Sequence, residues 1–261
     1  MVPKEVLLVI TGLIVFFVVL YVAYTSIAET LEGPSGDDGA DGKQGKTGKA
    51  GKDGVQIGSP PPPALFANQL IYTDPNNLTY TFTVPAGITK IKIELVGGGG
   101  GGNGGASTGG GGGGGAYLME VLTVAPGDVI GLIVGAGGKG GLSTGGAGQI
   151  GGTTLFFAPG LPRQAGGGDG GTNTSAGTGG IGFSPGTVYL IINGARGGNW
   201  TTSAVGTGGD SGGRMGTGGV GGVTDTPAAG PGVQYGGGGG AGYDTGFAGG
   251  DGASGVVIVS W

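Results

Sequence analysis

Two short glycine motifs are the segments best suited to bind a phosphate. Residues 135–140 read GAGGKG, a Gly-x-Gly-x-x-Gly spacing that follows an apolar segment. In dinucleotide sites of this kind the pyrophosphate lies at a helix N-terminus, but residues 141–148 contain no helix-forming run. Gly45-Lys46-Thr47 matches the end of a P-loop, yet Ala40 stands where its first glycine is needed. We therefore expect no nucleotide site and no cofactor.

The residue types that usually carry out catalysis are missing or scattered. The chain has no histidine and no cysteine, which excludes the commonest general base, thiolate nucleophiles, disulfides and thiolate metal sites. Charged residues make up 10% of the chain and the net charge is −5, unlike a basic nucleic-acid-binding surface. We expect neither an enzyme, a metal site nor a nucleic-acid partner. The C-terminal part has scattered acidic residues, which we interpret as unpaired, solvated turn residues: Glu94, Glu120, Asp128, Asp169, Asp210, Asp225, Asp244 and Asp251.

A few large side chains lie inside glycine-rich stretches, beyond any expected strand. Aromatic rings on a stiff backbone are good recognition groups for sugars or protein surfaces, and arginines can bind anionic groups. The alternative is that the rings fill gaps between loops and sheets. The candidate recognition residues are Trp200, Tyr235, Tyr243, Phe247, Arg196 and Arg214. Asn77, Asn173 and Asn199 begin N-glycosylation sequons, which matter only in a glycosylating compartment.

Residues 1–30 have the composition of a membrane anchor. Residues 6–28 are uncharged and apolar, and as a helix they would span roughly 30–35 Å. Lys4 precedes this segment and acidic residues follow it, which favours a C-terminal part outside the membrane. A cleaved signal peptide and a buried core helix are the alternatives. The residues expected to contact lipid include Val6, Leu13, Phe16, Phe17, Leu20 and Ala28.

Residues 31–58 carry a strict three-residue glycine repeat. Such a Gly-X-Y run predicts a collagen-type triple helix, and therefore a homotrimer, because only glycine fits at the crowded axis. The alternative is a flexible hydrophilic linker. Residues 59–64 then form a proline-rich linker. The axial glycines are Gly33, Gly36, Gly39, Gly42, Gly45, Gly48, Gly51 and Gly54.

Residues 65–261 alternate strand-like segments with long glycine runs. Apolar and polar residues alternate over 78–84 and 88–96, with a Pro-Ala-Gly turn between them. A second pair follows at 117–124 and 129–134, and further strands are expected at 153–157, 187–193 and 256–261. No segment after residue 30 has a sustained helical period. We expect an all-β domain, a β-sandwich with antiparallel strands.

The glycine runs at 97–115, 135–152, 166–182, 194–222 and 236–252 are too long for hairpin turns. Chains without Cβ atoms can form threefold, polyproline-II-like helices that pack side by side and pair their backbones. The runs would then build a rigid brick, with the large side chains at its tips. The alternative is a set of mobile linkers.

Several motifs resemble the glycine-rich domain of phage and viral surface proteins. Residues 82–91 read FTVPAGITKI and lead through Glu94-Leu95-Val96 into a glycine run. Residues 122–128, LTVAPGD, are similar to that family's second hairpin, and residues 249–261 resemble its closing strand. The resemblance covers about Thr79 to Trp261. It implies a jelly-roll-like β-sandwich fused to polyglycine-II loops, as in receptor-binding tips of tail fibres.

The membrane segment and the collagen-like run suggest what such a domain is attached to. Tail fibres have no anchor, so we expect a structural or spike protein of a virion with an internal membrane. Its partners would be the bilayer, two further copies, and a host-surface receptor or neighbouring capsid proteins. A bacterial cell-surface adhesin or matrix protein is the alternative. Thr-Gly-Gly repeats at Thr108, Thr144, Thr178, Thr207 and Thr217 raise an ice-binding surface as a third hypothesis, which their irregular spacing disfavours.

Overall fold

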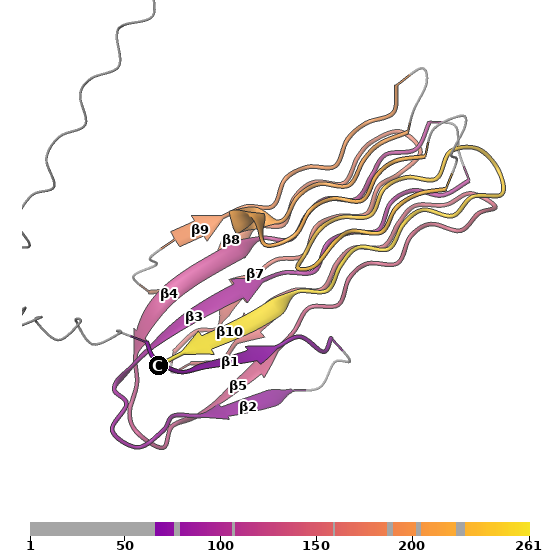
Figure 1. Cartoon of the computed structure of the whole chain (residues 1–261). Helices are drawn as coiled ribbons and strands as arrows, with labels where there is room; N and C mark the ends of the chain where they lie inside the picture. Colours follow the sequence, from indigo (N-terminus) through magenta and orange to yellow (C-terminus); the bar gives the residue numbers. More distant parts are fainter. Residues whose placement is uncertain are drawn as a thin grey trace, which may run out of the picture. The chain divides into compact units, whose positions relative to one another are not determined.

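The computed structural model describes residues 66–75, 79–105, 108–158, 160–186, 190–201, 205–222 and 228–261 (Figure 1). The expected membrane anchor, collagen-like repeat and proline-rich linker lie outside these residues. Across the described part of the chain, none of the elements is a helix with the length and apolarity needed to span a membrane. The described residues 66–261 belong to one compact unit.

The described part is all-β, with two antiparallel sheets of five strands each. One sheet has the order β1-β10-β3-β4-β9, and the other has the order β2-β5-β6-β7-β8. The first contains β1 (Gln69–Tyr72), β10 (Val256–Ser260), β3 (Lys90–Val96), β4 (Tyr117–Thr123) and β9 (Leu190–Ile192). The second contains β2 (Tyr80–Thr83), β5 (Val129–Ile133), β6 (Thr154–Phe156), β7 (Arg163–Ala165) and β8 (Gly182–Phe183).

A shared apolar core joins the inner faces of the two sheets. Ile91, Ile93 and Leu95 alternate along β3 and are fully buried, as the period of two predicted. They belong to one cluster with Phe82 from β2, Phe156 from β6 and residues of β4, β5 and β10. The sheets therefore pack face to face. Every expected strand segment contains a strand, whereas the short strands β1, β7 and β8 were not expected.

The long glycine runs leave the sheets at one common end (Figure 1). They follow β3, β5, β7 and β9 and return to β4, β6, β8 and β10. The first described residues and the C-terminus lie at the opposite end, where Asn68 and Trp261 exchange backbone hydrogen bonds of 3.0 Å. The described part thus has two poles, with the entry from the N-terminal region at one and the tips of the glycine runs at the other.

Backbone hydrogen bonds within the glycine runs repeat every three residues. In segment 97–105 the N–H groups at every third position donate to the same neighbouring segment, over 2.8–3.0 Å. Gly97, Gly100 and Asn103 donate to segment 110–116. The N–H groups one position further along donate to segment 146–152, and those two positions further along donate to segment 247–253. A β-strand pairs with two neighbours at most, so this threefold pattern joins the runs into a bundle rather than a sheet. We call these segments together the glycine bundle.

Three segments form the centre of the glycine bundle: 97–104, 109–116 and 236–242. Bonds from Gly100 to Gly113, from Gly112 to Gly239 and from Gly239 to Gly100 connect them in a triangle. All their residues are buried. The remaining segments surround this centre in a closed ring, each bonded to the next: 135–142, 147–152, 166–172, 176–181, 194–201, 205–211, 216–222, 228–235 and 248–255.

The central segments need glycine because backbone surrounds each Cα. A Cβ built on Gly100, Gly113 or Gly239 would lie under 3.0 Å from a carbonyl group of an adjacent segment. In the ring segments the burial pattern also repeats every three residues, so one residue in three faces outward. Outward positions carry the side chains, as at Thr178 and Ile181.

Candidate functional site

The distal tip is the end of the glycine bundle away from the sheets. Its described residues are 103–105, 108–109, 142–147, 172–176, 199–201 and 243–248, which connect the outgoing and returning segments. Glycines with positive φ, Gly105, Gly145 and Gly246, allow the chain to reverse there. The distal tip is therefore built from several loops that are far apart in sequence.

Hydrogen bonds tie these loops to one another. Gly104 and Gly146 exchange backbone bonds of 3.0 and 3.2 Å, and the Gly105 N–H donates to the Phe247 carbonyl over 2.9 Å. The Gly246 N–H donates to the Ser143 carbonyl over 2.9 Å. Three loops thus hold one another through their backbones, which leaves their side chains available for contact.

Asn103 is the one polar side chain among the central residues of the bundle's outgoing segment 97–104, and it is fully buried. Its Nδ2 donates to the Gly146 carbonyl over 2.7 Å and to the Asn173 Oδ1 over 2.6 Å. Thr108 Oγ1 adds a bond to the Asn173 carbonyl over 3.1 Å. Asn103 therefore positions the 143–146 and 172–175 loops from inside the bundle.

Three of the candidate recognition residues lie at the distal tip. Trp200 is 44% exposed and Phe247 is 38% exposed, while Tyr243 is half-buried. Phe247 and Tyr243 belong to the same loop. Next to Trp200, the Asn199 Oδ1 accepts a bond from the Ala176 N–H over 2.9 Å. The tip thus presents aromatic side chains from two loops held by hydrogen bonds.

The other candidates lie elsewhere. Tyr235 is at the sheet end of the bundle, where it packs with Met215 against Val96 and Tyr117. Arg196 is exposed along the ring segment 194–201. Arg214 belongs to the 3-10 turn Gly212–Arg214, which follows the ring segment 205–211 at the sheet end. Asn77 lies outside the described residues.

The Gly-x-Gly-x-x-Gly motif is part of the ring. The Gly135 N–H donates to Thr154 Oγ1, the Gly138 N–H to the Gly99 carbonyl and the Gly140 N–H to Asp251 Oδ1, over 2.8–2.9 Å. These donors are the groups that would bind a pyrophosphate, so the motif serves packing of the bundle. Among the described residues no group of acidic side chains has the arrangement of a metal site.

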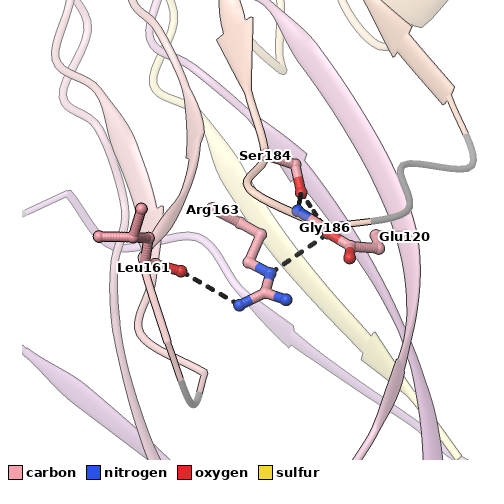
Figure 2. A network of polar contacts seen from close by, with 5 residues as sticks. All are labelled: Glu120, Leu161, Arg163, Ser184 and Gly186. Atoms are coloured by element: carbon pink, nitrogen blue, oxygen red, sulfur yellow. Dashed lines mark hydrogen bonds and ion pairs between the residues drawn. The ribbon is translucent and has the colours of Figure 1, made fainter.

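A buried ion pair between the sheets was missed from the sequence (Figure 2). Glu120 on β4 points inward and accepts bonds from Arg163 Nε on β7, over 3.3 Å, and from Ser184 Oγ, over 2.8 Å. Arg163 Nη1 also donates to the Leu161 carbonyl over 3.1 Å. Our interpretation of Glu120 as a solvated turn residue is wrong. The signal was present, because Glu120 lies between Leu118 and Leu122 on the inward face of an alternating strand.

Two further acidic residues are paired on the surface. Glu94 on β3 contacts Lys92 over 2.7 Å and accepts the Tyr117 hydroxyl over 2.7 Å; burial and this bond to a carboxylate raise the pKa of Tyr117. Asp251 accepts bonds from Lys139 Nζ over 2.7 Å and from the Gly140 N–H over 2.8 Å. Burial raises the pKa of Asp251, but these bonds outweigh it and hold that pKa below its usual value.

Comparison with known proteins agrees with this architecture. None of the curated proteins compared with the chain matches it. The sequence model of a family described as a glycine-rich domain matches residues 74–261, which is more than half of the chain. The matched region begins just before β2 and includes the whole glycine bundle. The chain therefore belongs to the glycine-rich domain family.

Proposed function

We propose that this protein is a membrane-anchored, homotrimeric structural or spike protein of a virion, which carries the distal tip of its glycine bundle outward for attachment. The observation that carries the proposal is the opposition of the two poles. The chain enters the described part beside Trp261, and the tip loops lie at the far end of the bundle. An anchor and stalk before residue 66 would therefore hold the tip away from the membrane.

The proposal treats the two sheets as a jelly-roll-like β-sandwich and the glycine bundle as polyglycine II. The support is the shared core between the sheets and the three-residue repeat of N–H donors, because a threefold extended helix has three residues per turn. Such a bundle is stiff, since its interior backbone groups are bonded to several neighbouring segments at once.

Stiffness favours recognition by the tip. A loop that is already ordered loses little conformational entropy when it binds a partner. Aromatic rings supply contact area at a small entropic cost, and they are common among residues that dominate binding energy. Trp200, Tyr243 and Phe247 are therefore the contact residues of the proposal, with a host-surface glycan or protein as the partner.

The stalk would add affinity by multivalency. Three tips on one rod bind a repetitive surface with much higher avidity than one tip. The Gly-X-Y repeat at 33–54 is the sequence feature that supports three copies. Without a trimer, the weak binding expected of a small tip would not hold a particle on a cell.

Two measurements on the detergent-solubilised full chain test the proposal. Native mass measurement is expected to give three copies, with weakened association when residues 33–56 are deleted. Binding to a glycan array and to host-type cells is expected to fall roughly thirtyfold in Trp200→Ala or Phe247→Ala, the effect of losing about 2 kcal/mol. Val220→Ala is the matched control, because Val220 is exposed along the side of the bundle. A monomeric mass for both the full chain and the deletion variant would refute the trimer. Unchanged binding by the tip variants would refute attachment through the tip.

A further inference from the structure

The outer face of the sheet β2-β5-β6-β7-β8 is apolar, and no described segment covers it. Strand alternation points its outward residues away from the shared core, and cross-strand pairing sets Ile133 beside Leu155, and Gln164 beside both Leu155 and Phe183. We call this surface the apolar face. Its apolar residues are Val129, Ile133, Leu155, Phe157, Ile181 and Phe183.

Exposure on the apolar face is high for residues of this kind. Val129 is 67% exposed, Ile181 71% and Phe183 48%. The inward neighbours confirm the direction of the side chains, because a Cβ on Gly182 would meet Ile191 of the opposite sheet. Contiguous exposed apolar surface of this type marks an interaction site in soluble domains.

The apolar face continues onto one side of the glycine bundle. Segments 147–152, 166–172 and 176–181 extend directly from the ends of β6, β7 and β8. Ile150, which is 68% exposed, lies on this side. A shallow groove lined by Ile150, Asp169 and Thr178 runs along it. The surface therefore extends along the long axis of the described part, from sheet to bundle.

The outer face of the other sheet is different. It carries the Lys92–Glu94 ion pair, and Met215 and Tyr235 from the glycine bundle pack on its upper part over Val96 and Tyr117. The apolar face, by contrast, has only threonines and Gln164 among its outward polar residues on the strands. Among the described strands it is thus the sheet surface free of charge and of such cover.

We propose that the apolar face is where the heads of three copies of this chain pack together around the axis of the stalk. The inference rests on the proposed trimer. The last glycine of the triplet repeat, Gly54, is separated from Phe66 by a linker that spans at most about 40 Å when extended. Three heads would then be held at millimolar effective concentration.

Electrostatic repulsion also favours other copies of this chain as the partner of the apolar face. Residues 66–261 contain nine acidic and six basic residues, a net charge of −3, so identical heads repel one another. The described strands of the apolar face have no outward charge, so three copies can approach there without this repulsion and with burial of exposed side chains, whereas Asp169 lies further along, on the glycine bundle. Turning the apolar faces inward also keeps the long axes of the bundles parallel, with all distal tips at one end.

Thiol alkylation of the full-length protein in detergent tests the packing. The chain has no cysteine, so Ile181→Cys introduces a single thiol on the apolar face. Val220→Cys is a matched control, because Val220 is 68% exposed on a ring segment away from segments 147–181. Each is also combined with Gly45→Glu, which disrupts the triplet repeat. Native mass is measured on every sample.

We expect a trimeric mass and alkylation at position 181 about tenfold slower than at position 220, because the faces must open before the reagent enters. Gly45→Glu is expected to raise the rate at position 181 and leave position 220 unchanged. A trimeric mass with equally fast alkylation at both positions would overturn the packing and leave the trimer standing. Slow alkylation at position 181 in a Gly45→Glu sample of single-copy mass would also overturn it, since the shielding would then come from a single chain. A single-copy mass would overturn the trimer and this packing together.

Discussion

Gly113→Ala should destabilise the protein strongly, although it adds one methyl group. Gly113 lies in the central segment 109–116, donates to the Asp169 carbonyl over 2.9 Å and accepts from the Gly100 N–H over 2.8 Å. Its new Cβ would lie under 3.0 Å from the carbonyl group of Thr178. This neighbour is backbone, so it cannot rotate aside as a side chain would.

The size of the effect follows from what must move. Segment 176–181 is attached to the centre by bonds from Gly177 to Gly111 and from Gly180 to Gly114, both 2.9 Å. Loosening two such bonds costs about 1 kcal/mol each, and overpacking costs about 1–3 kcal/mol. Reduced freedom of the unfolded chain returns up to about 1 kcal/mol. The net loss is about 2–5 kcal/mol, or roughly 4–20 °C in Tm for a domain of this size.

Gly131→Ala is the control. Gly131 lies in β5, and a Cβ there would meet the Phe157 ring at 3.4 Å, an ordinary contact. We expect a neutral or slightly raised Tm, because glycine weakens a strand interior. The assay is thermal unfolding followed by fluorescence of Trp261, whose ring packs on Phe82 with centroids 5.4 Å apart. Trp200→Phe removes the other tryptophan. Equal melting of the two glycine variants would refute a close-packed bundle.

Further predictions concern the buried pair, the surface pair and the tip. Arg163→Met should cost about 3–5 kcal/mol by leaving a buried carboxylate without this partner, and adding Glu120→Leu should restore most of it, as measured by a urea-unfolding cycle. The pKa of Asp251 is lower in the folded than in the unfolded chain, so the stability that this carboxylate contributes is present above its ordinary pKa of 3.8 and lost as pH falls through the folded value. Melting between about pH 5 and pH 2.5 should therefore depend less on pH in Asp251→Asn. Asn103→Ala should speed amide hydrogen exchange in residues 143–146 and 172–175, while exchange in β3 and β4 stays unchanged.

The sequence was sufficient for most of the sheets. The two-residue alternation of apolar and polar residues predicted β3 and β4. The turn before β3 and the turn after β4 were recognisable from their proline and glycine residues, and the glycines of these turns, Gly87 and Gly127, have positive φ. β7 and β8 were missed because they have three and two residues and β7 carries an arginine inward. Pairing of β7 with β6, and the partner Glu120 across the core, stabilise a segment that has no strand pattern of its own.

The candidate tip was only partly predictable. Of the aromatic residues inside glycine runs, Trp200, Tyr243 and Phe247 lie at the bundle's distal end, but the same reasoning included Tyr235, which lies at the sheets. The difference is set by where each run reverses. The runs after β9 reverse several times before returning to β10, and nothing in the spacing of glycines alone says which reversal is distal.

The arrangement of segments in the glycine bundle can be read from the sequence, but not with the two-residue period of strands or the 3.6-residue period of helices. A threefold segment with neighbours on all sides has no outward position, so its residues are glycine, alanine or, at Asn103, an amide that donates two hydrogen bonds to the tip loops, as in 97–104 and 236–242. A ring segment has one free side, and its larger residues therefore recur every third position, as at Thr207 and Asp210 or Thr217 and Val220. Uninterrupted glycine thus marks the centre and a three-residue period marks the ring. The side chains of the ring are then the positions at which such a bundle can change its surface while the packing beneath stays the same.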